Sequence, residues 1–160
     1  MNKRYLIGEE IVFDAKPDAV PYNYRISYKM AQLCLIMDIC SRGGCSLLKL
    51  HMISMGLSTE QDMQNLKSLA YDNLTNYAVV RFDPAVNHAI RYATADGLVV
   101  QQQNGLFRLT PAGRSYAKKI IKETNLMTEE KSYLSSLSTM LTEEKIKNLT
   151  SLWRYSGAED

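Results

Sequence analysis

The sequence predicts a mainly α-helical fold with one small antiparallel β-hairpin. Two observations in residues 82–123 carry this prediction. A helix start, made of a capping side chain and then a proline at the first helical position, occurs at Asp83 and Pro84 and again at Thr110 and Pro111. Between these helices, β-prone runs flank Asn104-Gly105, the strongest short hairpin signal. The expected order is therefore helix, hairpin, helix.

This order predicts a winged helix-turn-helix with a β-wing. The first helix, residues 85–96, holds the recognition-helix position, and Gly97 is a typical residue to end it. Residues 98–109 form the wing. Such a fold binds nucleic acid or proteins and seldom performs covalent chemistry.

Helix-breaking and helix-capping residues divide the chain into three expected segments. Residues 1–24 form an N-terminal arm, because Pro17 and Pro21 interrupt their short apolar runs. Residues 25–123 form the winged-helix domain, and residues 124–160 form a C-terminal helical extension packed on the same domain. The 160-residue length suits a single domain.

Further helices are predicted from apolar periodicity and capping residues. The first starts near Ser27 and carries one apolar stripe. Ser46 caps a second helix, and residues 58–61 match a capping box that starts a third. Acidic first turns predict two C-terminal helices, residues 129–140 and 143–155.

Composition and charge restrict the class of protein. Apolar residues make up 46% and charged residues 22%, but no apolar run approaches the ~20 residues that a membrane span needs. Glu9 and Glu10 interrupt the apolar stretch that a signal peptide requires. We therefore expect a cytoplasmic protein without a membrane partner. The net charge of +2 is too small to identify a nucleic-acid binder.

Residues with catalytic or metal-binding chemistry do not form a recognisable pattern. The cysteines, Cys34, Cys40 and Cys45, lack a C-x-x-C pair, and neither His51 nor His88 completes a zinc pattern. A phosphate-binding glycine-rich loop is also missing from the sequence. We expect no catalytic, cofactor or metal site and no small-molecule substrate, and an enzyme with an unrecognised site is the weakest hypothesis.

Two groups of polar residues are candidate contacts to DNA or a protein partner. Asn87, His88 and Arg91 should face outward from the recognition helix, and Asn and Arg suit base edges in a major groove. A helix with a single Arg is equally consistent with a protein-binding or solvated face. The second group is a basic stretch that can touch phosphates, touch an acidic partner or remain solvated: Arg108, Arg114, Lys118, Lys119 and Lys122.

Two aromatic residues of the last helix are candidate interface anchors. Trp153 is the single tryptophan, and Tyr155 is close to it in the sequence. Tryptophan is enriched at interface centres, although packing within the chain is the interpretation we favour.

Four sequence blocks together resemble a known bacterial family. They are SLLKLHMISMGL (46–57), RFDPAVNHAIRYATADGLV (81–99), NGLFRLTPAGRSYAKKI (104–120) and LTEEKIKNL (141–149). This chain resembles the small middle component of ABC-three-component defence systems, which are related to Lamassu. The resemblance covers most of the chain after about Arg25, and its most family-like block is 81–99.

The resemblance implies a non-enzymatic accessory subunit in an anti-phage or anti-plasmid complex. It would bridge an SMC/Rad50-like ATPase and an effector through protein–protein contacts, and it could touch double-stranded DNA through the complex. The family supplies no catalytic residues to transfer. The rival hypothesis is a stand-alone transcriptional regulator that binds DNA as a homodimer through Asn87, His88 and Arg91.

Overall fold

The structure is a computed structural model that describes residues 25–72 and 81–156, with side chains described up to residue 152. The predicted N-terminal arm, residues 1–24, lies outside this part. The fold is mainly α-helical with a two-stranded antiparallel sheet, as predicted. In chain order the elements are α1 (Ile26–Cys40), α2 (Leu47–Gly56), α3 (Glu60–Asp72), α4 (Pro84–Ala95), β1 (Val99–Gln101), β2 (Phe107–Leu109), α5 (Pro111–Lys122), α6 (Thr128–Leu137) and α7 (Glu143–Ser156).

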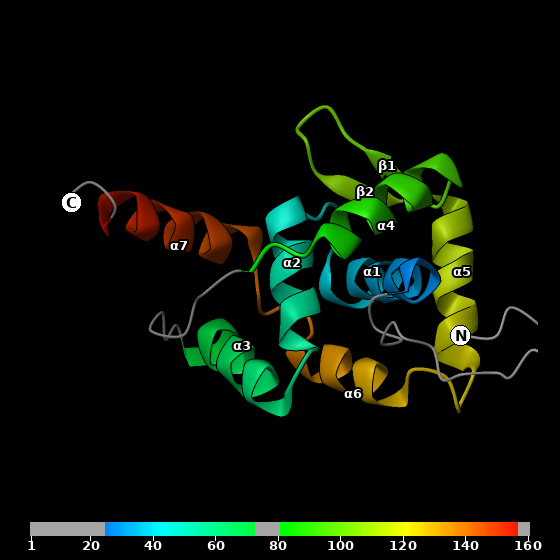
Figure 1. Cartoon of the computed structure of the whole chain (residues 1–160), viewed down its shortest axis with the longest axis horizontal. Helices are drawn as coiled ribbons and strands as arrows, with labels where there is room; N and C mark the ends of the chain where they lie inside the picture. Colours follow the sequence, from blue (N-terminus) through cyan, green and yellow to red (C-terminus); the bar gives the residue numbers. More distant parts are fainter. Residues whose placement is uncertain (1–24, 73–80, 157–160) are drawn as a thin grey trace, which may run out of the picture.

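Helix α1 lies at the centre of the molecule. Figure 1 shows it nearly end-on, with α2, α4, α5 and α6 arranged around it, and all four pack against it. The single apolar stripe predicted for this helix is therefore wrong: the helix is enclosed, so buried side chains occupy most of its circumference. These residues are Lys29, Ala31, Gln32, Leu33, Cys34, Leu35, Ile36, Met37 and Cys40.

Three predicted helix caps are confirmed. The Ser46 hydroxyl accepts a hydrogen bond from the backbone N–H of Lys49 at 3.1 Å and starts α2. The Asp83 carboxylate and the Thr110 hydroxyl start α4 and α5 in the same way, each followed by a proline in the first turn. Each cap satisfies a backbone donor that the helix itself cannot satisfy.

The connection from α4 to the hairpin is a tight Schellman-type turn. Gly97 has φ of +75°, and the N–H of Leu98 donates to the carbonyl of Ala93 at 2.9 Å. The chain then enters β1, whose Val99 pairs with Leu109 of β2. The hairpin loop has Gly105 at φ +84° after a hydrogen-bonded turn, which matches a three-residue loop instead of a two-residue Asn-Gly turn.

The outer edge of the hairpin carries one more pairing. Cys45, between α1 and α2, forms an isolated antiparallel bridge to Phe107. Two hydrogen bonds of 2.8 Å join their backbones. The loop after α1 is thereby fixed against β2.

Lysine side chains from later segments donate hydrogen bonds to backbone carbonyls near the carboxyl ends of three helices. Lys49 of α2 donates to the carbonyl of Cys40 at the end of α1, at 2.7 Å. Lys131 of α6 donates to the carbonyl of Ile120 in α5 at 3.1 Å. Lys145 of α7 bonds to a carbonyl in the last turn of α3. A positive charge at this end of a helix is also favoured by the helix dipole.

The C-terminal helices pack on the rest of the described molecule. Helix α6 contacts α1 and α3, and α7 contacts α2 (Figure 1). Helix α6 ends at Leu137, not at Met140 as predicted, because Ser138 leaves the helical conformation with φ of +50°. Among the described helices, none combines the length and the apolar character needed to cross a bilayer.

Candidate interaction surface around the fourth helix

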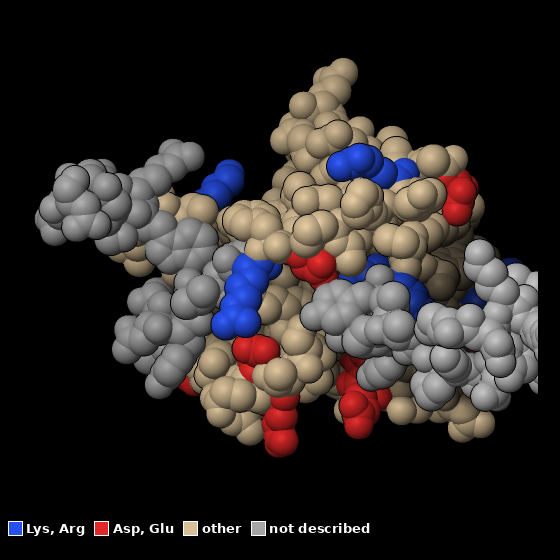
Figure 2. Space-filling model, viewed as in Figure 1, with Lys and Arg blue, Asp and Glu red and all other residues tan. Residues whose placement is uncertain are grey.

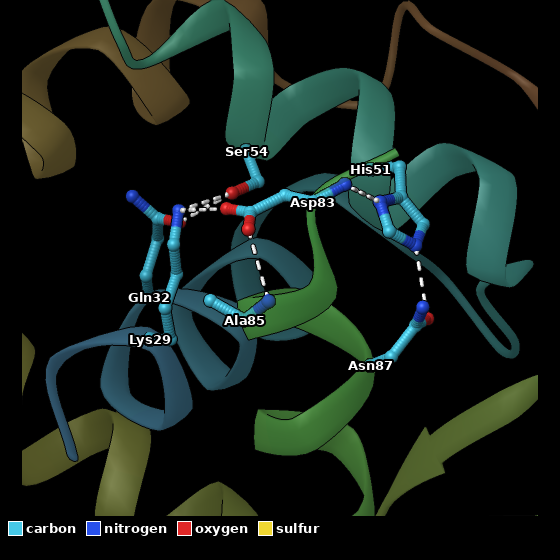
Figure 3. A network of polar contacts seen from close by, with 7 residues as sticks. All are labelled: Lys29, Gln32, His51, Ser54, Asp83, Ala85 and Asn87. Carbon is cyan, nitrogen blue, oxygen red and sulfur yellow. Dashed lines mark hydrogen bonds and ion pairs between the residues drawn. The ribbon is translucent and has the colours of Figure 1, made fainter. Parts of the chain in front are cut away.

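The amino end of α4 is anchored by a buried lysine. Asp83 accepts from the N–H of Ala85 at 2.9 Å, and its other carboxylate oxygen lies 3.5 Å from the Lys29 ammonium (Figure 3). Lys29 is 4% exposed and also donates to Ser54 at 2.8 Å and to Gln32 at 3.3 Å. Burial lowers the pKa of Lys29, and the charge of Asp83 opposes this shift. The network joins α1, α2 and the residue that caps α4.

A buried histidine makes a second connection to the same helix. His51 of α2 is 1% exposed. Its Nδ1 accepts from the backbone N–H of Asp83 at 3.2 Å, so Nε2 carries the ring proton and donates to Asn87 Oδ1 at 3.1 Å (Figure 3). The ring of Phe82 packs edge-on at a centroid distance of 5.0 Å. His51 therefore fixes both the entry and the first turns of α4.

The position of Asn87 differs from the prediction. We expected this side chain to face outward as a base-contacting group, but it is only half-exposed and its amide oxygen is bound to His51. The cause is a contact between residues 36 positions apart. His88 and Arg91 are exposed, as predicted, and Tyr92 lies beside them with 54% exposure. The free face of α4 therefore presents His88, Arg91 and Tyr92.

The surface around this helix carries little charge. Figure 2 shows mainly uncharged residues over α4 and the hairpin, interrupted by a small blue patch, whereas carboxylates gather over α3 and α6. The hairpin tip is polar, with glutamines and an asparagine at residues 101–104. This surface lacks the dense positive charge with which proteins usually attract a DNA backbone.

The predicted basic stretch is divided between paired and unpaired side chains. Lys118 forms an ion pair with Asp38 of α1, with Nζ and Oδ2 3.0 Å apart. Lys119 and Lys122 are exposed on α5. Arg108 and Arg114 line a hollow of about 190 Å³, and Arg42 of the α1–α2 loop lines it as well. The sequence did not indicate that Arg42 belongs with the other two, because three separate segments supply them.

The two candidate anchors in α7 are not placed by the structure at the level of side chains. Trp153 and Tyr155 lie on the last turns of this helix, beyond the side chains that are described. Leu152, the last of those, is 55% exposed. The role of Trp153 and Tyr155 as anchors stays a prediction.

Burial makes the cysteine thiols poor nucleophiles. It raises the pKa of Cys34, Cys40 and Cys45 to about 12, so all three are protonated at neutral pH. They are free thiols that pack in the core. Within residues 25–72 and 81–152, His, Cys, Asp and Glu side chains form no cluster able to hold a metal ion.

A larger groove of about 800 Å³ lies between α1, α3 and α6, and no pattern in the sequence indicated it. Hydroxyl and carboxylate side chains dominate its walls, and the hydroxyl of Tyr28 in α1 donates to Glu130 in α6. Lys29 contributes to the lining, although its ammonium is already bound within the network at α4.

Comparisons with models of protein families, with curated proteins and with solved structures found no significant match to this chain. The candidate surfaces are therefore defined by the geometry alone.

Proposed function

We propose that the chain is a winged-helix adaptor, the non-enzymatic accessory subunit of a cytoplasmic bacterial defence complex against phages or plasmids. In this role it bridges an SMC/Rad50-like ATPase and its effector through protein–protein contacts. The resemblance of the sequence blocks supplies the identity of the partners. The geometry of α4 supports the adaptor role.

The order of elements supports a winged helix. Helix α4 immediately precedes the hairpin, and α5 follows it, which is the order expected of a recognition helix and its wing. Cys45 adds an isolated antiparallel bridge beside β2. In this arrangement the free face of α4 and the hairpin are the surfaces open to a partner.

The composition of the free face of α4 carries the adaptor proposal. Asn87, the side chain best suited to read an adenine, is bound to His51. The large side chains that α4 exposes are those of His88, Arg91 and Tyr92. Tyr and Arg are the residue types that most often dominate the binding energy of protein interfaces. We therefore favour a protein partner on this face over a base-reading role.

Affinity purification of the tagged chain from its native host, followed by mass spectrometry, tests the proposal. The wild-type chain should retain a large SMC-like ATPase and an effector in near-stoichiometric amounts. The double variant Arg91→Ala with Tyr92→Ala should lose most of both partners. The control, Ile121→Ala with Lys122→Ala, removes a similar exposed pair from α5 and should retain them.

Other outcomes would contradict the adaptor proposal. Recovery of the chain alone, as a homodimer with a discrete DNA fragment, would support the rival transcriptional regulator. Arg91→Ala alone should then abolish binding to that fragment. Catalytic turnover by the purified chain would overturn both hypotheses.

A further inference from the structure

The basic hollow beside β2 has an unusual charge balance. Its three arginines, Arg42, Arg108 and Arg114, are exposed, and within the described residues none of them has an ion pair or a side-chain hydrogen bond. The only carboxylate among the lining residues is Asp38, and Lys118 already pairs with it at 3.0 Å. The hollow therefore has an excess of positive charge that the described molecule does not neutralise.

The floor of the hollow is fixed by the fold. Ser41 donates to the carbonyl of Gly44 at 2.7 Å and closes the turn after α1. Gly44 packs so closely on the hairpin that a Cβ there would lie 2.9 Å from a carbon of Leu106. Gly43, by contrast, faces open space. The loop that carries Arg42 is thus held against the hairpin that carries Arg108, and the three cations share one site.

Arg114 occupies a position where a positive charge is unfavourable for folding. It lies in the first turn of α5, next to the positive end of the helix dipole. The guanidinium of Arg114 has no ionic partner among the described residues, and the helix dipole disfavours its charge. It is therefore well suited to bind an external anion. Guanidinium groups bind phosphate through paired N–H donors.

The size of the hollow and the charges beyond it indicate the kind of anion. A volume of about 190 Å³ is enough for a phosphate group with some hydration. From the hollow, Arg114, Lys118 and Lys122 continue along α5 at intervals of four residues, and Lys118 also pairs with Asp38. At ~1.5 Å per residue this row is about 12 Å long, over which one DNA strand presents three or four phosphates at ~3.4 Å of axial rise each.

We infer that the hollow of Arg42, Arg108 and Arg114, extended by the α5 row, is a binding site for the phosphate backbone of duplex DNA. The site contacts phosphates without reading sequence, since its cations lie outside the α4 face. It is separate from the partner surface of the proposed function. The chain can therefore hold a protein on α4 and a DNA backbone beside β2.

Fluorescence anisotropy with a labelled random-sequence duplex, over about 50 to 200 mM salt, tests the site. The hollow variant combines Arg42→Gln, Arg108→Gln and Arg114→Gln in the full chain. The control combines Lys67→Gln, Arg81→Gln and Lys147→Gln, cations outside both the hollow and the free face of α4, and lowers the net charge equally. The hollow variant should bind about tenfold more weakly, with a salt slope shallower by about 1 or more, while the control should stay within about threefold.

Results that would contradict the proposed DNA site can be told apart in this experiment. Equal losses in both variants would mean that only net charge attracts DNA, and a loss confined to the control would place DNA outside the hollow. Either result, or an absence of DNA binding, overturns the site. A titration of inorganic phosphate, followed through the amide NMR signals of Gly43 and Gly44, provides a second arm. Shifts there without duplex binding would indicate a free phosphate or a phosphorylated protein and would overturn the DNA assignment.

The purification experiment separates this inference from the proposed function. The hollow variant should still retain the ATPase and the effector, because its α4 face is intact. Loss of partner binding by the α4 variant would leave the DNA result unchanged.

Discussion

Two polar assemblies in this molecule each combine side chains from three segments, but only one of them pairs its charges within the fold. The network at the amino end of α4 gathers Lys29, Ser54 and Asp83 from three segments, and each of these side chains has a partner within it. The basic hollow gathers Arg42, Arg108 and Arg114, also from three segments, and none has an ionic partner among the described residues. We infer that the first assembly stabilises the fold and that the second is available to a ligand.

The largest effect should come from removing the buried lysine. Lys29→Met takes the ionic partner from Asp83, and breaking a buried pair costs about 3–5 kcal/mol. The Asp83 side chain is 28% exposed, so we expect about 2–3 kcal/mol less unfolding free energy in urea titrations. The matched exchange Arg42→Met in the hollow should change the unfolding free energy by less than about 0.5 kcal/mol. Similar losses of unfolding free energy in the two variants would contradict the distinction between the two assemblies.

The same lysine predicts a dependence on pH. Burial lowers the pKa of Lys29 in the folded state, so the unfolded chain holds this proton more tightly. The contribution of Lys29 to stability should therefore rise with pH between its lowered folded pKa and the ordinary value of 10.5. Urea titrations of wild type and Lys29→Met across pH 7.5 to 10.5 should show a growing difference. A difference that shrinks with pH would contradict the direction of the shift.

Neighbouring residues on α4 should respond differently to truncation. Asn87→Ala leaves the Nε2–H of buried His51 without its acceptor, which should cost about 1–2 kcal/mol of unfolding free energy. His88→Ala, one residue later on the exposed side, should cost less than about 0.5 kcal/mol. Thermal melts of the two variants measure the contrast, and equal melting temperatures would argue against a structural role for Asn87.

The smallest effect is a gain in stability. Arg114→Gln removes a positive charge from the first turn of α5 and should raise the unfolding free energy by about 0.3–0.5 kcal/mol at low salt. The gain should fade as salt screens the dipole. A loss of stability would show that Arg114 supports the fold, and the case for an external anion would weaken.

The sequence predicted those features that depend on neighbours within a few residues. The caps at Ser46, Asp83 and Thr110 and the turn at Gly97 are of this kind, and all were found in the structure. Each consists of a side chain or a glycine acting on backbone groups nearby, so composition and spacing suffice. The early end of α6 escaped prediction because the conformation of Ser138 has no signature in the sequence.

Contacts between distant segments could not be predicted. His51 and Asn87 are 36 residues apart, and without their contact Asn87 has the pattern of an exposed residue on an amphipathic helix. The burial of Lys29 depends on four helices surrounding α1. Likewise, Arg42 joins the hollow only because Cys45 pairs with β2. In each case tertiary packing decides whether a polar residue is structural or free.

The lysine caps at the helix ends have a consequence for how the chain can be divided. Helices α1, α3 and α5 each depend on a donor from a later segment, namely Lys49, Lys145 and Lys131. A fragment ending at residue 123 would lack two of these three donors, and the last turns of α3 and α5 should fray. Amide hydrogen exchange there should be slow only when α6 and α7 are docked. We therefore expect the C-terminal helices to fold cooperatively with the helices whose ends they close.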